Sequence, residues 1–223
     1  GALQDYGRAL IVGSQSFGKG TVQDITGLSS GQLKLTISKF YRVSGDSTQH
    51  RGVLPDIAFP SAYDTEEVGE SQLDNVLPWD RIHRVPHKTD DTLTPYLQTL
   101  TDAHRQRIQR DPDFIHLFER VDLSDSWSAD AELSLNLSER RARSEAWDKA
   151  LFSLDNKRLK AKGLSPNSDT ESWKEDRNID EDNIAESDPI LFEAGQILGN
   201  QIGVISASNR LQIVQLEPNM ATP

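Results

Sequence analysis

The hydrophobic pattern of this chain changes its period once, close to Pro60. Before that point apolar residues stand in short runs or alternate with polar ones, which is typical of β-strands. After it they recur every three or four residues, as they do on one face of a helix. We therefore expect an α+β fold in three parts. Residues 1–62 would be β-rich, residues 63–205 would form a mainly helical domain with one or two short strands, and residues 206–223 would be a flexible tail.

Two strands are expected in the first part. Residues 9–12 are a continuous apolar run that ends at Gly13, which is typical of a strand buried on both faces. Residues 32–41 alternate instead, and they predict a half-buried strand. One face of this strand would carry Leu33, Leu35 and Ile37, and the other would carry Lys34, Thr36 and Ser38. Residues 43–47 have the composition of a turn.

Four helices are expected in the second part. Proline follows Thr94, Asp111 and Asp188, in each case where the apolar pattern indicates the first turn of a helix. A longer helix is predicted from Ser138 to about Lys162, with an end at Gly163. The expected apolar faces carry, in chain order, Leu97, Leu100, His104 and Ile108; Phe114, Ile115, Phe118 and Val121; Ala142, Ala146, Trp147, Ala150, Leu151 and Leu154; and Ile190, Leu191, Ala194, Ile197 and Leu198.

Three further segments of the second part are not expected to be helical. Residues 132–137 alternate as one isolated strand, and residues 211–216 also look like a strand. Residues 167–188 are acidic and poor in apolar side chains, so they predict an exposed, solvated loop with some possibility of touching a partner protein.

Composition excludes several classes of function. The net charge of −11 argues against binding to nucleic acid or to anionic lipid, because both need a basic surface. No apolar run is long enough to span a bilayer. The absence of cysteine excludes disulfides, thiolate metal sites and cysteine nucleophiles. The first residues lack the pattern of a signal peptide, so we expect the chain to begin inside a longer protein.

A metal site is not expected either. His83, His87, His104 and His116 match no common zinc spacing, so they are interpreted as surface or helix-face residues, and no cofactor is expected. The plainest interpretation of the four tryptophans is that they cover the edges of the core. Trp79 stands where the β-rich part gives way to the helical part, and it could hold one against the other.

The segment that carries chemistry is the glycine-rich stretch of residues 13–23, in which Lys19 stands between two glycines. The spacing of Gly13 and Gly18 before this lysine partly fits a phosphate-binding loop. That motif needs a hydroxyl residue after the lysine and then a helix, whereas this chain has Gly20 and a β-pattern there. A solvated loop lysine is the plainer alternative.

The surroundings of this lysine resemble those of the tail-specific (C-terminal processing) proteases. The resemblance lies in motifs that follow one another in the family's order with short spacers, at residues 4–13, 17–23, 38–45, 47–49 and 51–57. The rest of the chain more loosely resembles the helical C-terminal extension of the family's long, periplasmic branch, at residues 132–136 and 188–191. The resemblance implies that residues 1–62 are the C-terminal part of a serine/lysine protease core, and that the protein is periplasmic.

The resemblance also implies a mechanism in which a lysine amine activates a serine. A lysine with the reference pKa of about 10.4 is protonated at neutral pH, so a lysine base needs a poorly hydrated site that lowers this value. The neutral amine then takes the serine proton and later returns it to the leaving amine. Lys19 matches this general base. Gln23 matches the family's third member, and its amide could hydrogen-bond the lysine amine. Asp5 matches an acidic position near the active site, where structural support and catalysis are about equally open.

The nucleophile is expected outside this chain. In the family it precedes the lysine by more residues than this chain has before Lys19, and a PDZ-like substrate-reading domain is absent as well. Ser14 and Ser16 lie immediately before Lys19, and nothing recommends either as the nucleophile. We therefore expect the chain alone to be proteolytically inactive. Residues 1–60, without their neighbours, would be partly disordered or would pair between chains, whereas the helical part would fold regardless.

Two functions follow from these observations. In the first, the chain is the C-terminal portion of a serine endopeptidase that cleaves proteins recognised by an apolar C-terminal tail. In the second, it is a non-catalytic interaction module that binds an adaptor or a substrate protein. The partners to be expected are such substrates, an adaptor protein, and a second copy of the chain paired through exposed strands of the core.

Overall fold

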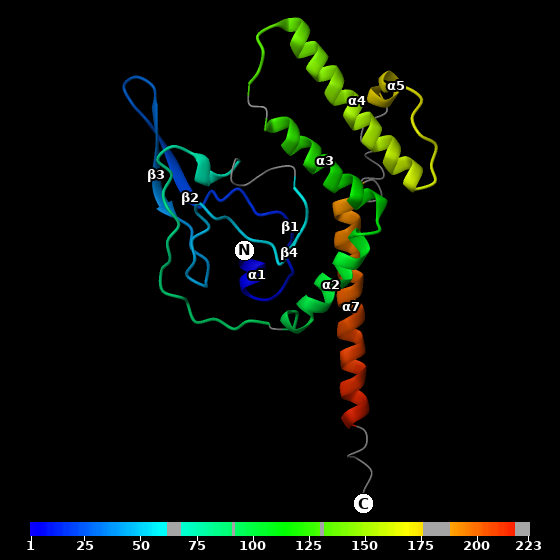
Figure 1. The fold of residues 1–223 in the computed structure, drawn as a ribbon. Coiled ribbons are helices and arrows are strands. Elements are labelled where there is room, and N and C mark those ends of the chain that lie inside the picture. Colours follow the sequence, from blue (N-terminus) through cyan, green and yellow to red (C-terminus); the bar gives the residue numbers. More distant parts are fainter. Residues whose placement is uncertain (62–67, 91, 130–131, 176–187, 217–223) are drawn as a thin grey trace, which may run out of the picture. The chain divides into compact units, whose positions relative to one another are not determined.

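The computed structural model describes residues 1–61, 68–90, 92–129, 132–175 and 188–216 (Figure 1). The chain divides into two compact units, Gly1–Leu97 and Gln98–Pro223. The first unit holds the small sheets and the second is helical, so the predicted α+β fold is confirmed. No helix of the described chain is long and apolar enough to cross a membrane.

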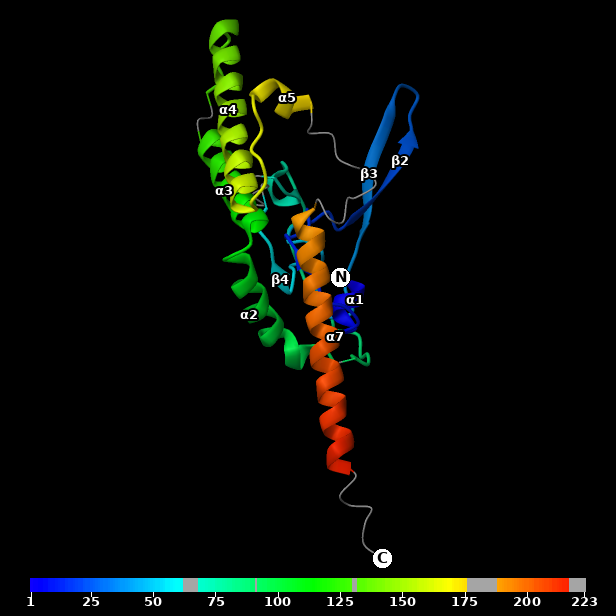
Figure 2. The same cartoon turned by 90° about the vertical axis from the view of Figure 1, so that its right-hand side faces the viewer.

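The first unit contains two small sheets. Strand β1 (Val12–Gly13) pairs in parallel with β4 (Ile57–Ala58), and β2 (Thr21–Gly27) pairs antiparallel with β3 (Gln32–Lys39). A short helix α1 (Ala2–Asp5) precedes them, and the 3₁₀ turns η1 (Glu70–Gln72) and η2 (Thr94–Tyr96) follow. The β2–β3 hairpin projects from the rest of the unit as a two-stranded ribbon (Figures 1 and 2).

The first predicted strand is shorter and less buried than expected. Only Val12–Gly13 has strand geometry, and residues 9–13 are half-buried rather than buried. The reason is that one strand alone pairs with it within the described chain. Asp56 strengthens this junction, because its carboxylate accepts the Ile11 N–H at 2.7 Å while its own N–H donates to the Ile11 carbonyl at 2.7 Å.

The second predicted strand forms, but its apolar face is not buried. A register irregularity lies between Val22, which pairs with Ser38, and Gln23, which pairs with Thr36, so Ile37 is left over between the two pairs. The bulge breaks the simple alternation that the sequence shows. All three apolar residues are exposed, Leu35 by 54%, so the expectation of a half-buried face is wrong.

The helix starts predicted at Asp111 and Asp188 are confirmed, whereas Thr94 and Pro95 belong to the 3₁₀ turn η2 and the α-helix there begins only at Leu97. The helices that follow the first unit's sheets are α2 (Leu97–Ile108), α3 (Pro112–Ser128), α4 (Leu137–Ala161), α5 (Thr170–Glu175) and α7 (Pro189–Leu216). Asp111 accepts the N–H groups of Asp113 and Phe114 at the start of α3. Asp188 caps α7 in the same way, through the N–H groups of residues 190 and 191. Helix α4 is followed by Gly163, which has the left-handed conformation expected there.

Two predicted strands of the helical unit are wrong. Residues 132–136 have no strand geometry, and α4 begins at Leu137 because the Asn136 side chain accepts the N–H of Ser138 at 2.9 Å. Leu135 is 97% exposed, and no strand among the described residues of this unit is available to pair with the segment. Residues 211–216 continue helix α7 instead of forming a strand.

The expected loop at residues 167–188 is partly wrong as well. Residues 170–175 form α5, and Trp173 is only 4% exposed. Its indole N–H donates to Asp155 Oδ2 at 2.6 Å, and its ring meets Phe152 edge-on at 5.8 Å. One buried aromatic side chain therefore gives order to an otherwise polar segment. Residues 176–187 lie outside the described residues.

The buried faces of two helices also differ from the prediction. On α4 only Leu151 is buried, whereas Ala142 and Ala146 are exposed. Helices α3 and α4 lie side by side (Figures 1 and 2), and the exposed alanines belong to the first turns of α4. On α7 Ile197 is buried, but Ile190, Leu191 and Leu198 are exposed.

Among the side chains described on α7, the most deeply buried one is a carboxylate. Glu193 is 2% exposed, and its Oε1 atom lies 2.8 Å from His104 Nδ1 and 2.6 Å from Arg107 Nη2, both on α2. Arg107 Nε contacts both carboxylate oxygens, at 3.0 and 3.1 Å. The same guanidinium reaches Asn200, two turns further along α7. Because a buried carboxylate is stable only when it is paired, this contact joins the two helices.

Removal of the arginine is therefore expected to separate them. Arg107→Ala leaves Glu193 buried beside His104 alone, and should destabilise the helical unit by about 3 kcal/mol. Arg105→Ala is the matched control, because Arg105 is exposed and makes only a 3.7 Å pair with Asp102; it should change stability by less than about 0.5 kcal/mol. Urea unfolding followed by circular dichroism measures both. Equal effects of the two substitutions would contradict the role given to Glu193.

The cap of α5 predicts a dependence on pH. The N–H of Ser172, the hydroxyls of Ser168 and Ser172 and the N–H of Glu171 lower the pKa of Asp169 from 3.8 to about 2. A lowered carboxyl pKa stabilises the fold above about pH 4, and this contribution is lost as the pH falls towards 2. An NMR titration should place the Asp169 midpoint near 2, with loss of α5 signals over the same range. A midpoint near 3.8 would show that the cap is not formed, and Asp169→Asn should remove the dependence.

Candidate functional site

The loop that carries Lys19 is tightly confined on both sides of the lysine. Gly18 has a φ of +92°, and a Cβ there would lie 2.8 Å from the carbonyl oxygen of His50. Gly20 is buried, and a Cβ at this position would clash with the backbone nitrogen of Gln49. Each position therefore accepts only glycine, so the two glycines fix the path of the chain around the lysine.

The buried side-chain amide of Gln49 holds this loop in place. Gln49 is 1% exposed, and its Oε1 atom accepts the N–H of Gly20 at 2.8 Å. Its Nε2 group donates to Glu70 Oε1 at 3.0 Å, and its own N–H donates to Ser47 Oγ. The N–H of Glu70 in turn donates to the carbonyl of Phe17 at 2.8 Å. The two ends of the lysine loop are thus bonded to one buried polar network.

The Lys19 amine is bonded to two side chains of β2. Its Nζ atom donates to Thr21 Oγ1 at 3.1 Å and to Gln23 Oε1 at 3.3 Å. Side chains two residues apart lie on the same face of a strand, which explains why partners at two and four residues from the lysine both reach it. Gln23 Nε2 donates onward to Thr36 Oγ1 on β3 at 3.3 Å, so the amide is oriented by the ribbon.

Within the described residues, this arrangement leaves one position on the lysine nitrogen without a bonding partner. Lys19 itself is exposed. An ammonium has three N–H groups, and Thr21 and Gln23 accept two of them. In a neutral amine the two N–H groups can keep these acceptors, and the remaining position is the lone pair. Chemically the arrangement suits an amine that accepts a proton from a third group.

Asp5 lies in a different part of the unit. Its two carboxylate oxygens accept from Arg42, at 2.6 Å from Nη2 and 2.8 Å from Nε. Arg42 Nη2 also donates to Gln4 Oε1 at 2.9 Å. The pair thus fastens α1 to the turn after β3, and none of the described contacts of Asp5 involves Lys19 or Gln23. Of the three predicted site residues, the structure brings together only Lys19 and Gln23.

Neither of the two serines that precede the lysine contacts its amine within the described chain. Ser16 Oγ accepts the N–H of Val53 at 2.8 Å, and its backbone N–H donates to the Val53 carbonyl. Among the described contacts, Lys19 Nζ has no bond to Ser14 or Ser16. No group of three or more His, Asp or Glu residues in the described chain is placed to hold a metal ion.

Four residues that shape this site were not singled out from the sequence: Thr21, Thr36, Gln49 and Glu70. Thr21 could have been found from the strand period alone, since it stands two residues before Gln23. Gln49 and Glu70 could not, because a single sequence does not distinguish a buried glutamine or glutamate from the exposed ones that are far more frequent.

Two family models match the chain. One, described as the C-terminal domain of tail specific protease, covers residues 63–203, and the other, described as peptidase family S41, covers residues 1–59. Proteins named as tail-specific, carboxy-terminal-processing or CtpA-like proteases match as well.

The relatives match over different parts of the chain. A tail-specific protease of Haemophilus influenzae is 33% identical over 224 residues, which is 92% of this chain and 32% of that protein. A carboxy-terminal-processing protease of Bartonella bacilliformis is 49% identical over 80 residues, 33% of this chain and 18% of the relative. A probable CtpA-like serine protease of Staphylococcus epidermidis is 41% identical over 59 residues, 26% of this chain and 12% of the relative. The chain thus spans about a third of the length of the Haemophilus protein.

The confinement of the lysine loop predicts a strong effect of one added methyl group. Gly20→Ala should displace Gln49, break its bond to the Gly20 N–H and release the loop. Gly27→Ala, at the far end of β2, has open space around it and should leave the loop unchanged. Hydrogen exchange at residues 17–20 measures the difference, and Gly20→Ala should raise it by at least about tenfold. Unchanged protection in Gly20→Ala would show that the network does not hold the loop.

Proposed function

Because this chain belongs to the tail-specific protease family, we propose that it is the C-terminal portion of a serine endopeptidase in which Lys19 is the general base. The observation that carries this proposal is the lysine amine held by Thr21 and Gln23 on a confined loop, with one position of the nitrogen unused. A serine supplied by a part of the protease outside this chain would approach that position.

The proposed reaction uses the amine twice. The lone pair of Lys19 accepts the serine proton while the serine oxygen bonds to the carbonyl carbon of the substrate. The lysine ammonium then gives that proton to the leaving amine as the C–N bond breaks, which leaves an acyl-enzyme. Water repeats the same two steps and releases the acid. Throughout, Gln23 and Thr21 would keep the amine oriented, and Asp5 would act only through the position of α1.

The exposed ribbon supports the proposal that the active site is completed by other parts of a longer protein. Ile25, Leu35 and Ile37 are each more than half exposed, although strands with such residues are normally covered. If the part of the protease that covers the ribbon also covers Lys19, it excludes water from the amine, as a lysine base requires. We infer that this chain alone does not cleave proteins.

The remaining parts of the proposal follow from the family. We propose that the substrates are proteins with an apolar C-terminal tail, that an adaptor protein can take part, and that the enzyme works in the periplasm. The names of the Haemophilus and Bartonella relatives support action at the C-terminal end of proteins.

The general-base role is tested by substitution in the full-length protease. Lys19→Ala should lower cleavage of a reporter protein with an apolar C-terminal tail by roughly a thousandfold or more, while folding and binding of the tail are retained. Lys34→Ala is the matched control, since Lys34 is exposed on the neighbouring strand of the same ribbon and should have no effect. Full activity without the Lys19 amine would refute the proposal and favour an interaction module without catalysis.

A further inference from the structure

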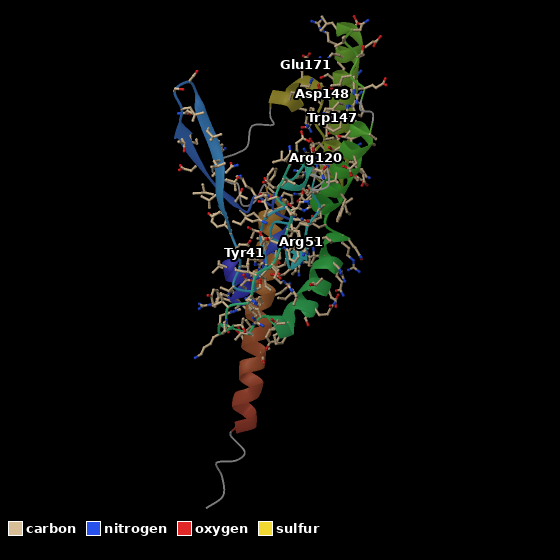
Figure 3. The ribbon with its side chains drawn as sticks, turned by 90° about the vertical axis from the view of Figure 1, so that its left-hand side faces the viewer. Tyr41, Arg51, Arg120, Trp147, Asp148 and Glu171 are labelled. Atoms are coloured by element: carbon tan, nitrogen blue, oxygen red, sulfur yellow. The ribbon has the colours of Figure 1, made fainter. Side chains whose placement is uncertain are left out.

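A small hollow lies between the end of α3 and the first half of α4. Its volume is about 260 Å³, and it is lined by Trp127, Leu133, Arg140, Arg143, Ser144 and Trp147. We call it the tryptophan hollow. Figure 3 marks its position through Trp147, which comes from α4 one residue before Asp148. None of its residues belongs to the lysine site of the first unit.

The walls of the tryptophan hollow are held in place without a ligand. The rings of Trp127 and Trp147 lie 5.2 Å apart at an interplanar angle of 55°. The guanidinium of Arg143 lies over the Trp127 ring at 5.6 Å. It also donates to the backbone carbonyl of Trp127 at 2.9 Å and to that of Glu132 at 3.4 Å. One arginine thus joins the end of α3, the connecting segment and α4 into a fixed wall.

A second arginine stands at the rim. Arg140 precedes Arg143 by three residues, so both lie on the same face of α4. Arg140 is exposed, and its side chain makes no ion pair or hydrogen bond within the part of the chain that the structure describes. The chain as a whole carries a net charge of −11, whereas the lining of the hollow, among the described residues, contains Arg140 and Arg143 and no acidic side chain. The rim is therefore a positive place on an acidic protein, and it attracts an anion.

The surface beside the hollow is apolar. Leu133, which lines it, is 64% exposed, and Leu135 and Leu137 in the segment that leads into α4 are more than half exposed too. Exposed apolar side chains scattered singly need no explanation, but these stand together with two tryptophan rings. The combination matches a ligand that has apolar side chains next to a negative charge.

We propose that the tryptophan hollow binds the apolar C-terminal residues of a substrate protein, with the free terminal carboxylate held by Arg140. The choice of ligand rests on the proposed protease function, and the site itself rests on the contacts given above. The hollow has room for one or two apolar side chains. A chain end fits better than an internal segment, because it brings a free carboxylate next to such side chains. A guanidinium can hold a carboxylate through two parallel hydrogen bonds. Such a contact would keep a substrate tethered to the helical unit.

Binding of a labelled peptide to this chain tests the proposal without any cleavage. The probe ends in three apolar residues with a free carboxylate, and fluorescence anisotropy reports its affinity. The same peptide with an amidated end should bind at least about tenfold more weakly, because it lacks the charge that Arg140 would hold. Arg140→Gln should cause a similar loss. Arg141→Gln is the matched control, since Arg141 is exposed next to Arg140 but does not line the hollow, and it should leave the affinity unchanged.

Several results would overturn the proposal. These are no binding of the free-carboxylate peptide, equal binding of the amidated peptide, and equal losses in Arg140→Gln and Arg141→Gln. Equal binding of an amidated peptide with an internal aspartate would overturn the assignment to a chain end. Trp147→Leu should weaken binding, and Arg140→Gln keeps the test decisive should that substitution disturb α4. Since no cleavage is measured, failure here leaves the role of Lys19 untouched, and failure of the Lys19 test leaves this binding result standing.

Discussion

The buried amide of Gln49 is the contact on which the geometry of the lysine site depends. The backbone of Gln49 occupies the space that any side chain at position 20 would need, and its side-chain amide accepts the N–H of that same glycine. Through Glu70 it also reaches the other end of the loop, at Phe17. The backbone thereby fixes the point from which the Lys19 side chain leaves the loop. Thr21 and Gln23 then accept hydrogen bonds from its amine. The groups that fix the backbone on both sides of Lys19 all lie within this chain.

Buried polar contacts have the same importance in the helical unit. Glu193 joins α7 to α2 through Arg107 and His104, and Asp155 receives the indole of Trp173. Burial by itself raises the pKa of Asp155, but the contacts with His116 and Trp173 and the charges of His116 and Arg158 outweigh it, so the pKa is lowered. The apolar core of each unit is small, and these pairs specify which surfaces meet.

Features that depend on neighbouring residues could be predicted from the sequence, and features that depend on distant ones could not. The starts of α3 and α7 follow from aspartate and proline side by side. The contact between Lys19 and Gln23 is implied by the resemblance to the protease family, and it is present in the structure. The strand predicted at residues 132–137 fails because a strand needs a partner, whereas Asn136 can cap a helix locally. The burial of Glu193 depends on Arg107, which lies 86 positions away, so no periodicity shows it.

The central claim, that Lys19 is the base for a serine outside this chain, is tested most directly by a crystal structure of the full-length protease. A serine-reactive phosphonate bound covalently would identify the nucleophile and fix its oxygen. Our account predicts that Lys19 Nζ lies within about 3 Å of that oxygen and keeps its bonds to Thr21 and Gln23. A labelled serine with another basic group beside it, and with Lys19 directed to solvent, would contradict the account.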